Sequence, residues 1–222
     1  MSSENKMILP VGKEPTDDIW DAMFTQRAIR YWQDKPIPRD VLEKIVKAAS
    51  KAPSGSNTQP WVFIVIDDND KRQRVGDSLL RIYESNEGLK ELLSAGEGAQ
   101  DKTQRLMLKG AKAFFSGLGK APAIIIPCLY QLSSPTPDPT SLLAGSSIYG
   151  AIQNLMLAAR ALGLGSVLTT AQAMLDEDLR SILEIPAEAT PVALIPIGYP
   201  DANFGPTNRK DVSEIIRWNG WS

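Results

Sequence analysis

The chain has 222 residues, of which 43% are hydrophobic and 23% are charged, and its formal net charge is -2. These values are ordinary for a globular protein and lack the basic excess of a dedicated nucleic-acid binder. The sequence contains one cysteine and no histidine, which excludes an intramolecular disulfide, a Ser-His-Asp triad and any metal site that needs imidazole. If the protein is an enzyme, a bound cofactor is the natural candidate for its chemistry.

The N-terminal residues lack the apolar segment of a signal peptide, and no window approaches about 18 consecutive apolar residues, the length that spans a membrane. We therefore expect a cytoplasmic protein with no membrane and no nucleic-acid partner. We expect one domain over residues 1–222, with a core at about 18–216, an N-terminal extension at 1–17 and a C-terminal tail at 217–222. The proline-rich segment Ser133–Thr140 is expected to be a loop within that domain.

Hydrophobic periodicity predicts helices and strands that alternate along the chain. The predicted helices are Asp17–Thr25, Asp40–Lys51, about 70–83, a stretch within about 88–116, Ser141–Leu162 and Asp176–Leu183. The predicted strands are Trp61–Ile66, Ala123–Tyr130, Ser166–Thr170 and Pro191–Gly198, and the three longer ones are apolar enough to be buried on both faces. This alternation predicts a layered α/β domain. The spacing permits a doubly wound parallel sheet and leaves open whether the sheet is parallel or mixed.

Two helix ends carry specific signals. Asp40 followed by Glu43 resembles a capping box, which predicts a helix start at that point. Gly163 suits the left-handed residue that ends a helix, so we expect the long helix Ser141–Leu162 to stop there.

The segment Thr25–Trp32 contains two arginines, Arg27 and Arg30, which would face the same way on one helical turn. Arginine presents a planar fork of donors that matches phosphate oxygens, so the pair is a candidate anion site. The alternative is a solvated pair that makes weak surface ion pairs.

The segment Ala52–Trp61 combines proline, glycine, serine, threonine, asparagine and glutamine between a predicted helix and a predicted strand. Its side chains supply hydroxyl and amide groups without any titratable group, and could hydrogen-bond the carbonyls and ring nitrogens of a heterocycle. The alternative is an ordinary connection, because the same residues dominate turns.

Two further segments are rich in glycine or in positive charge. Gly163–Thr170 contains a GxG pattern, but it lacks the third glycine and follows a helix, so we reject a dinucleotide fingerprint. Gly205–Lys210 ends in the adjacent cations Arg209 and Lys210, which could bind an anion or could start a solvated helix.

Taken together, four ordered segments resemble the FMN-dependent nitroreductase family. They read QRAIRYWQDKPIP, APSGSNTQPWVFIVI, SIYGAIQNLMLAARALGLGSVLTT, and IPIGYP with a downstream GPTNRKDVSEII. The resemblance covers about residues 18–216. It implies an α+β fold, a three-layer α/β/α sandwich around a mixed, mainly antiparallel sheet, in an intertwined homodimer. It also implies FMN at the dimer interface, in sites built from both subunits.

The resemblance places candidate flavin-binding residues along the chain. They are Arg27, Ala28, Arg30, Pro53, Ser54, Gly55, Ser56, Asn57, Gln153, Leu168, Thr169 and Arg209. Arg27 and Arg30 match the segment that contacts the phosphate, ribityl chain or N1–C2 edge, and Arg209 matches a late phosphate-binding arginine. The Pro53–Asn57 loop matches the one that reaches the flavin ring from the partner subunit. No catalytic acid or base is singled out, since the resemblance assigns hydride transfer to flavin N5, with Arg30 as the candidate cation near N1.

Three positions depart from the common family pattern. Gln26 and Ala28 stand where many members have arginine and serine, and Thr207 stands where many have lysine. Phosphate binding would therefore depend on fewer charges.

The implied function is an oxidoreductase with tightly bound FMN. NADH or NADPH would deliver hydride, and a small nitroaromatic, quinone or similar electron-poor acceptor would then be reduced with ping-pong kinetics. The acceptor pocket is expected to be shaped by residues 77–115, and the tail with Trp218 and Trp221 is expected to wrap the partner subunit. The alternatives are other flavin chemistry, such as enone reduction, dehalogenation or flavin transformation, and a non-catalytic flavin-binding protein.

Overall fold

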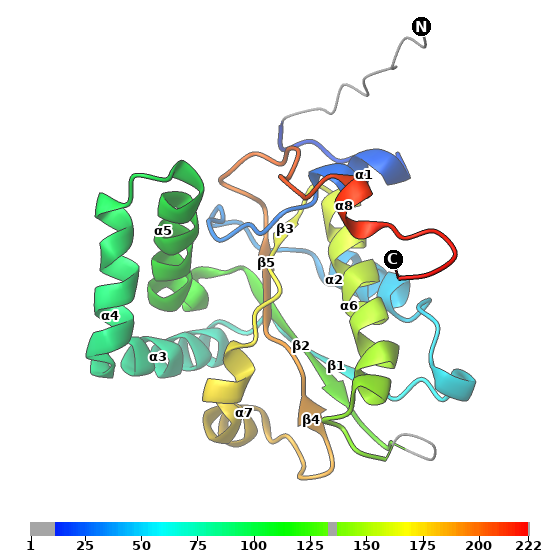
Figure 1. The fold of residues 1–222 in the computed structure, drawn as a ribbon. Coiled ribbons are helices and arrows are strands. Elements are labelled where there is room, and N and C mark those ends of the chain that lie inside the picture. Colours follow the sequence, from blue (N-terminus) through cyan, green and yellow to red (C-terminus); the bar gives the residue numbers. More distant parts are fainter. Residues whose placement is uncertain (1–11, 133–136, 222) are drawn as a thin grey trace, which may run out of the picture.

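The structure, a computed structural model, describes residues 12–132 and 137–221. Its centre is an antiparallel sheet in the order β1-β2-β5-β3, with the short strand β4 paired to β2 (Figure 1). The strands are β1 (Trp61–Ile66), β2 (Ala123–Leu129), β3 (Gly165–Ser166), β4 (Thr190–Pro191) and β5 (Ile195–Gly198). An isolated parallel bridge joins Ala28 to Ser166. The doubly wound parallel sheet is therefore wrong, and the α+β fold is confirmed.

Helices cover both faces of this sheet (Figure 1). They are α1 (Ile19–Thr25), α2 (Arg39–Ala49), α3 (Asn69–Ser85), α4 (Glu87–Ser94), α5 (Lys102–Gly117), α6 (Leu142–Ala161), α7 (Asp176–Leu183) and α8 (Val212–Ile215). One core cluster joins α2 and α6 to the sheet, and a second joins α3, α5 and α7 to it.

Strand β2 divides the two clusters because successive side chains of a strand point to opposite faces. Its residues are all buried. Those facing α2 and α6 are Ala123, Ile125 and Leu129, and those facing α3, α5 and α7 are Ile124, Ile126 and Cys128. The prediction of a strand buried on both faces is confirmed here.

Helix α6 positions much of the candidate site. Ser141 caps it by accepting a hydrogen bond from the amide of Ala144 at 3.1 Å, and Gly163, with φ of 74°, follows its end as predicted. By length and composition α6 could cross a membrane, but core helices pass the same test, and residues along its length pack in the core described above.

Several predicted boundaries are wrong. Strand β1 lies at the sheet edge, and only Ile66 in it is fully buried. The predicted strand Pro191–Gly198 is split, because its register against β2 shifts by one residue between the pair Cys128–Pro191 and the pair Ile125–Ile195, as in a β-bulge. The predicted strand Ser166–Thr170 is correspondingly reduced to Gly165–Ser166.

The predicted capping box at Asp40 is also wrong. Helix α2 starts at Arg39 with Pro38 as its N-cap and no side-chain cap, so Asp40 already lies in the first turn. A capping box does form at α8, between Asp211 and Glu214. Part of the predicted loop at 133–140 lies outside the described residues.

Candidate functional site

The segment that carries Arg27 and Arg30 runs along strand β3. Helix α1 ends at Thr25 because Gln26 is extended, and the amide of Ile29 then donates to the carbonyl of Ser166 at 3.0 Å. The prediction that both arginines share one helical turn is therefore wrong. Arg27 is exposed, whereas Arg30 is half-buried.

Gly165 permits this close approach. A Cβ atom at this position would lie 2.6 Å from Cγ2 of Ile29, closer than real Cβ contacts allow. The indole of Trp32 also donates to the carbonyl of Gly165 at 3.3 Å. Gly165, the second glycine of the GxG pattern, therefore allows the segment with Arg27 and Arg30 to pack closely on the sheet.

Arg30 faces a cavity of about 350 Å³ between α5 and the strand end after β3. The residues that line it are Arg30, Ala111, Phe114, Phe115, Leu168, Thr169, Thr170, Ala171 and Met174. The structure thus brings Arg30 together with the predicted residues Leu168 and Thr169. The hydroxyl of Thr169 donates to the carbonyl of Leu194 at 2.9 Å, which fixes its direction.

The guanidinium of Arg30 has unused donors. Within residues 12–132 and 137–221 it makes no hydrogen bond and no ion pair. Its side chain packs against Gly110 of α5, where a Cβ atom would lie 3.2 Å from Nη1. Burial lowers the pKa of Arg30, and the neighbouring Tyr31 partly opposes this effect. A half-buried cation without an acceptor is costly, so this position suits an anionic or electron-rich ligand.

The segment that carries Arg209 is joined to the same end of the molecule. The amide of Gly205 donates to the carbonyl of Thr25 at 3.3 Å, which links the two arginine segments through their backbones. Arg209 is exposed and donates only to the carbonyl of its neighbour Asn208. Arg27 has no acceptor among the described residues, so both guanidinium groups are available to an anion.

The Pro53–Asn57 loop lies at the other end of α6. The amide of Gly55 donates to Oγ of Ser147 at 3.2 Å, near the start of that helix. Ser147 lies 13 positions before Arg160, whose Nε donates to Oγ1 of Thr25 at the start of the arginine segment, and this spacing corresponds to roughly 20 Å along the helix axis. One chain therefore keeps this loop apart from the arginine segments.

The loop itself is exposed and locally strained. Ser56 and Asn57 have φ of 49° and 55°, a left-handed conformation that is unusual for residues with a side chain. Oγ of Ser54 accepts from the amide of Gln59 at 3.0 Å and holds the turn together. Gln153 is exposed near the middle of α6, between the two groups of predicted residues.

The cavity wall from α5 was missing from the predicted residues, although the stretch 77–115 was expected to shape a pocket. Phe114 is buried and contributes to the core, so its helical spacing resembles that of an ordinary core residue. Neither Phe115 nor Met174 had a recognisable signal. The Ser147 anchor of the loop was missed as well, since it depends on a contact between residues 92 positions apart.

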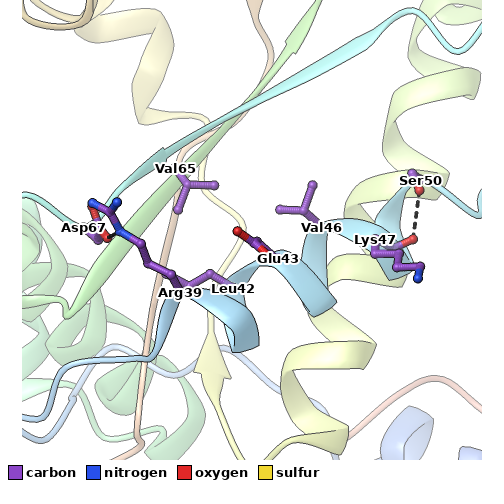
Figure 2. A pocket seen from close by; sticks show the side chains of 8 residues that line it. All are labelled: Arg39, Leu42, Glu43, Val46, Lys47, Ser50, Val65 and Asp67. Atoms are coloured by element: carbon purple, nitrogen blue, oxygen red, sulfur yellow. Dashed lines mark hydrogen bonds and ion pairs between the residues drawn. The ribbon is translucent and has the colours of Figure 1, made fainter.

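A second, larger cavity of about 660 Å³ lies between α2 and strand β1 (Figure 2). Arg39 and Asp67 form an ion pair at one end of it, and Leu42, Val46 and Val65 give it apolar walls. It contains none of the predicted flavin-binding residues and is separate from the Arg30 cavity.

The single thiol belongs to the core rather than to a reactive site. Burial raises the pKa of Cys128 to about 11, an effect that Arg180 partly opposes, so the thiol stays protonated near neutral pH. Among the described residues, no three metal-ligating side chains gather in one place.

Comparisons with known proteins agree on one family. The sequence profile of the nitroreductase family matches residues 24–199. An NADH dehydrogenase/NAD(P)H nitroreductase of Methanothermobacter thermautotrophicus is 32% identical over 206 residues, covering 92% of this chain and 88% of that protein. The iodotyrosine deiodinase of Danio rerio is 27% identical over 205 residues, covering 90% of this chain and 67% of that protein.

The fold agrees with this assignment. The crystal structure of an FMN and NADPH-dependent nitroreductase from Sphigopyxis sp. strain HMH superposes with a TM-score of 0.70 at 24% identity, covering 92% of this chain and all of that one. The profile match extends over most of the chain, from the end of α1 to the residue after β5. The chain therefore belongs to the nitroreductase family.

Proposed function

We propose that the chain is an FMN-dependent oxidoreductase that takes hydride from NADH or NADPH and reduces a nitroaromatic, quinone or similar electron-poor acceptor with ping-pong kinetics. The observation that carries the proposal is the half-buried guanidinium of Arg30. It has no acceptor among the described residues and faces a cavity with aromatic walls. When bound, FMN would supply reversible hydride transfer, which the side chains of this protein cannot perform alone.

The cations of the chain fit a flavin mononucleotide. Its phosphate carries nearly two negative charges, and each charge-assisted hydrogen bond contributes about 1.5–3 kcal/mol. Arg27 and Arg209 have spare donors and lie on segments joined by the bond between Gly205 and Thr25. We assign the phosphate to these two arginines and the ring edge to Arg30.

Each residue of the cavity then has a separate task. Arg30 would place a positive charge beside the ring system of a bound flavin and favour its reduced, more negative form, and the partial burial of Arg30 would strengthen that effect. Phe114 and Phe115 exclude water and offer flat apolar surfaces to a planar acceptor. Leu168 and Thr169 form the opposite part of the wall.

We further propose that the site is completed in a homodimer, in which the Pro53–Asn57 loop of each chain reaches the Arg30 cavity of the other. The single chain exposes large apolar side chains on α1, on α6 and in the C-terminal region. They include Ile19, Trp20, Met23, Phe24, Leu142, Leu143, Tyr149, Val212, Ile215, Trp218 and Trp221. Exposed apolar surface of this extent is typical of an interface. The cytoplasm is the compartment that we propose.

Reductive dehalogenation is the second candidate function, since several relatives are iodotyrosine deiodinases. The lining of the cavity favours the first candidate. Among the described residues that line it, Arg30 alone is charged, so this chain's part of the cavity offers no carboxylate to the ammonium group of an amino acid. We expect nitroarenes and quinones to be turned over faster than 3-iodo-L-tyrosine. A reversed order would make dehalogenation the better assignment.

The test is an absorbance spectrum of the purified protein, followed by anaerobic titration with NADH and NADPH. We expect bound FMN that is bleached by one of the two. Arg30→Gln should raise the Kd of FMN by about 10-fold to 100-fold, because it removes one charge-assisted contact. The control is Arg39→Gln, an exposed arginine paired with Asp67, which should bind FMN normally. A wild-type protein without flavin affinity would contradict the proposal.

A further inference from the structure

Arg160, in the last turn of α6, is a charged residue that is almost completely buried, with 3% of its surface exposed. Nε donates to Oγ1 of Thr25 at 2.8 Å, Nη1 to the carbonyl of Glu14 at 2.8 Å, and Nη2 to the carboxylate of Asp21 at 3.1 Å. The guanidinium carbon also lies 4.3 Å from the ring centroid of Phe204. A buried charge is tolerated only with such compensation, so these contacts define one arrangement.

The groups around Arg160 belong to the two segments that carry the proposed phosphate-binding arginines. Thr25 is the last residue of α1, two positions before Arg27. Phe204 lies five positions before Arg209, and the next residue, Gly205, donates to the carbonyl of Thr25 at 3.3 Å. Arg160 therefore holds the end of α1 and the Phe204–Gly205 segment in one place.

Arg160 is too deeply buried to contact a ligand itself, with 3% of its surface exposed. Each of its three guanidinium nitrogens already donates to a protein acceptor, and the guanidinium carbon lies over the ring of Phe204. Any influence on cofactor binding must pass through the segments that it holds.

We infer that Arg160 is a positioning residue that brings Arg27 and Arg209 together at the phosphate end of the FMN site. The inference rests on the proposed function. It predicts that loss of Arg160 weakens recognition of the phosphate while recognition of the flavin ring by Arg30 persists, since Arg30 is fixed separately by pairing with β3 and by packing on α5.

The test compares two ligands that differ only in the phosphate, FMN and riboflavin, bound to flavin-free full-length protein. The variant is Arg160→Met, which keeps much of the side-chain volume and removes the donor fork. We expect the preference for FMN over riboflavin to fall by about tenfold or more, while the Kd of riboflavin changes less than about twofold.

A matched control is available on the opposite side of the sheet. Arg180 of α7 also bonds three groups, namely Asp176 and the carbonyls of Pro186 and Ala189. Arg180→Met also removes a guanidinium that bonds three groups, although from a less buried site, so it should lower thermal stability without changing the preference for FMN. A loss of preference in both variants would indicate general destabilisation and would overturn the inference.

If Arg160→Met does not fold, Thr25→Val decides the same question, since it removes the acceptor of Nε together with the hydroxyl's own bond to the carbonyl of Asp21 and leaves the rest of the guanidinium contacts in place. An unchanged FMN preference in the variant that folds would also overturn the inference, with the proposed function intact. A wild-type protein that binds neither flavin would refute the proposed function, and the role of Arg160 with it.

Discussion

The two groups of proposed flavin contacts lie toward opposite ends of α6 and are held in different ways. The segment with Arg27 and Arg30 is fixed by backbone pairing to β3, close packing on Gly165 and contact with α5. The Pro53–Asn57 loop is exposed, contains left-handed residues and is anchored mainly through Ser147 and Ser54. One chain thus carries firmly held arginines at one end of α6 and an exposed polar loop at the other. We propose that the two meet only in a dimer, where the loop of one chain lies against the arginine segment of the other.

The largest effect is expected from loss of the dimer. Truncation after Lys210 removes the exposed side chains Ile215, Trp218 and Trp221. Each such side chain contributes about 1.5–3 kcal/mol when it is buried, so the dimer Kd should rise by more than about 100-fold. Sedimentation equilibrium measures this change, and unchanged sedimentation would show that the tail does not hold the partner.

A smaller effect should follow from disturbing only the segment with Arg27 and Arg30. Gly110→Ala places a Cβ atom 3.2 Å from Nη1 of Arg30, which must then shift by a few tenths of an ångström. We expect roughly threefold to tenfold weaker FMN binding and an altered visible spectrum of the bound flavin.

Gly117→Ala is the control for this variant. Gly117 lies in the same helix, and a Cβ atom there would meet no other heavy atom within 4 Å. Equal effects of the two substitutions would mean that the packing of Arg30 on α5 is unimportant for the flavin.

The smallest effect is expected from removing the hydrogen bond that anchors the Pro53–Asn57 loop. Ser147→Ala removes the acceptor of the Gly55 amide, but Gly55 is exposed and water can partly replace the bond. A net loss near 0.5–1 kcal/mol corresponds to a roughly twofold to fivefold lower kcat/KM, with little change in Tm. Ser146→Ala, on the exposed side of the same helix, should have no effect. If both variants behave like wild type, the hydrogen bond between Gly55 and Ser147 does not position the loop for catalysis.

The parts of the fold that the sequence predicted well are those in which burial is complete. Strand β2 is buried along its whole length, and α7 has the predicted bounds Asp176–Leu183. The apolar run of β1 was wrongly expected to be buried on both faces, because such a run does not distinguish a central strand from an edge that a partner could cover. Local periodicity cannot report on a second chain.

The candidate site was predictable in part. Arg30, Leu168 and Thr169, which the family resemblance named separately, line one cavity, and their contact with a flavin stays a prediction. The shared helical turn of Arg27 and Arg30 was wrong because Gln26 ends α1 in an extended conformation, which spacing alone does not reveal. Phe115 and the anchor Ser147 depend on tertiary contacts between distant segments, and helical spacing gave no signal for either.

Cross-subunit complementation tests the central claim most directly. One parent carries Arg30→Gln, the other carries Ser54→Gly, Ser56→Gly and Asn57→Gly, and the two chains are co-expressed with different tags. Each parent alone should be nearly inactive. Random pairing in a symmetric dimer should restore about a quarter of the wild-type NAD(P)H oxidation, because half of the dimers then contain one intact site of two. Activity no higher than that of either parent would show that each site is built within one chain.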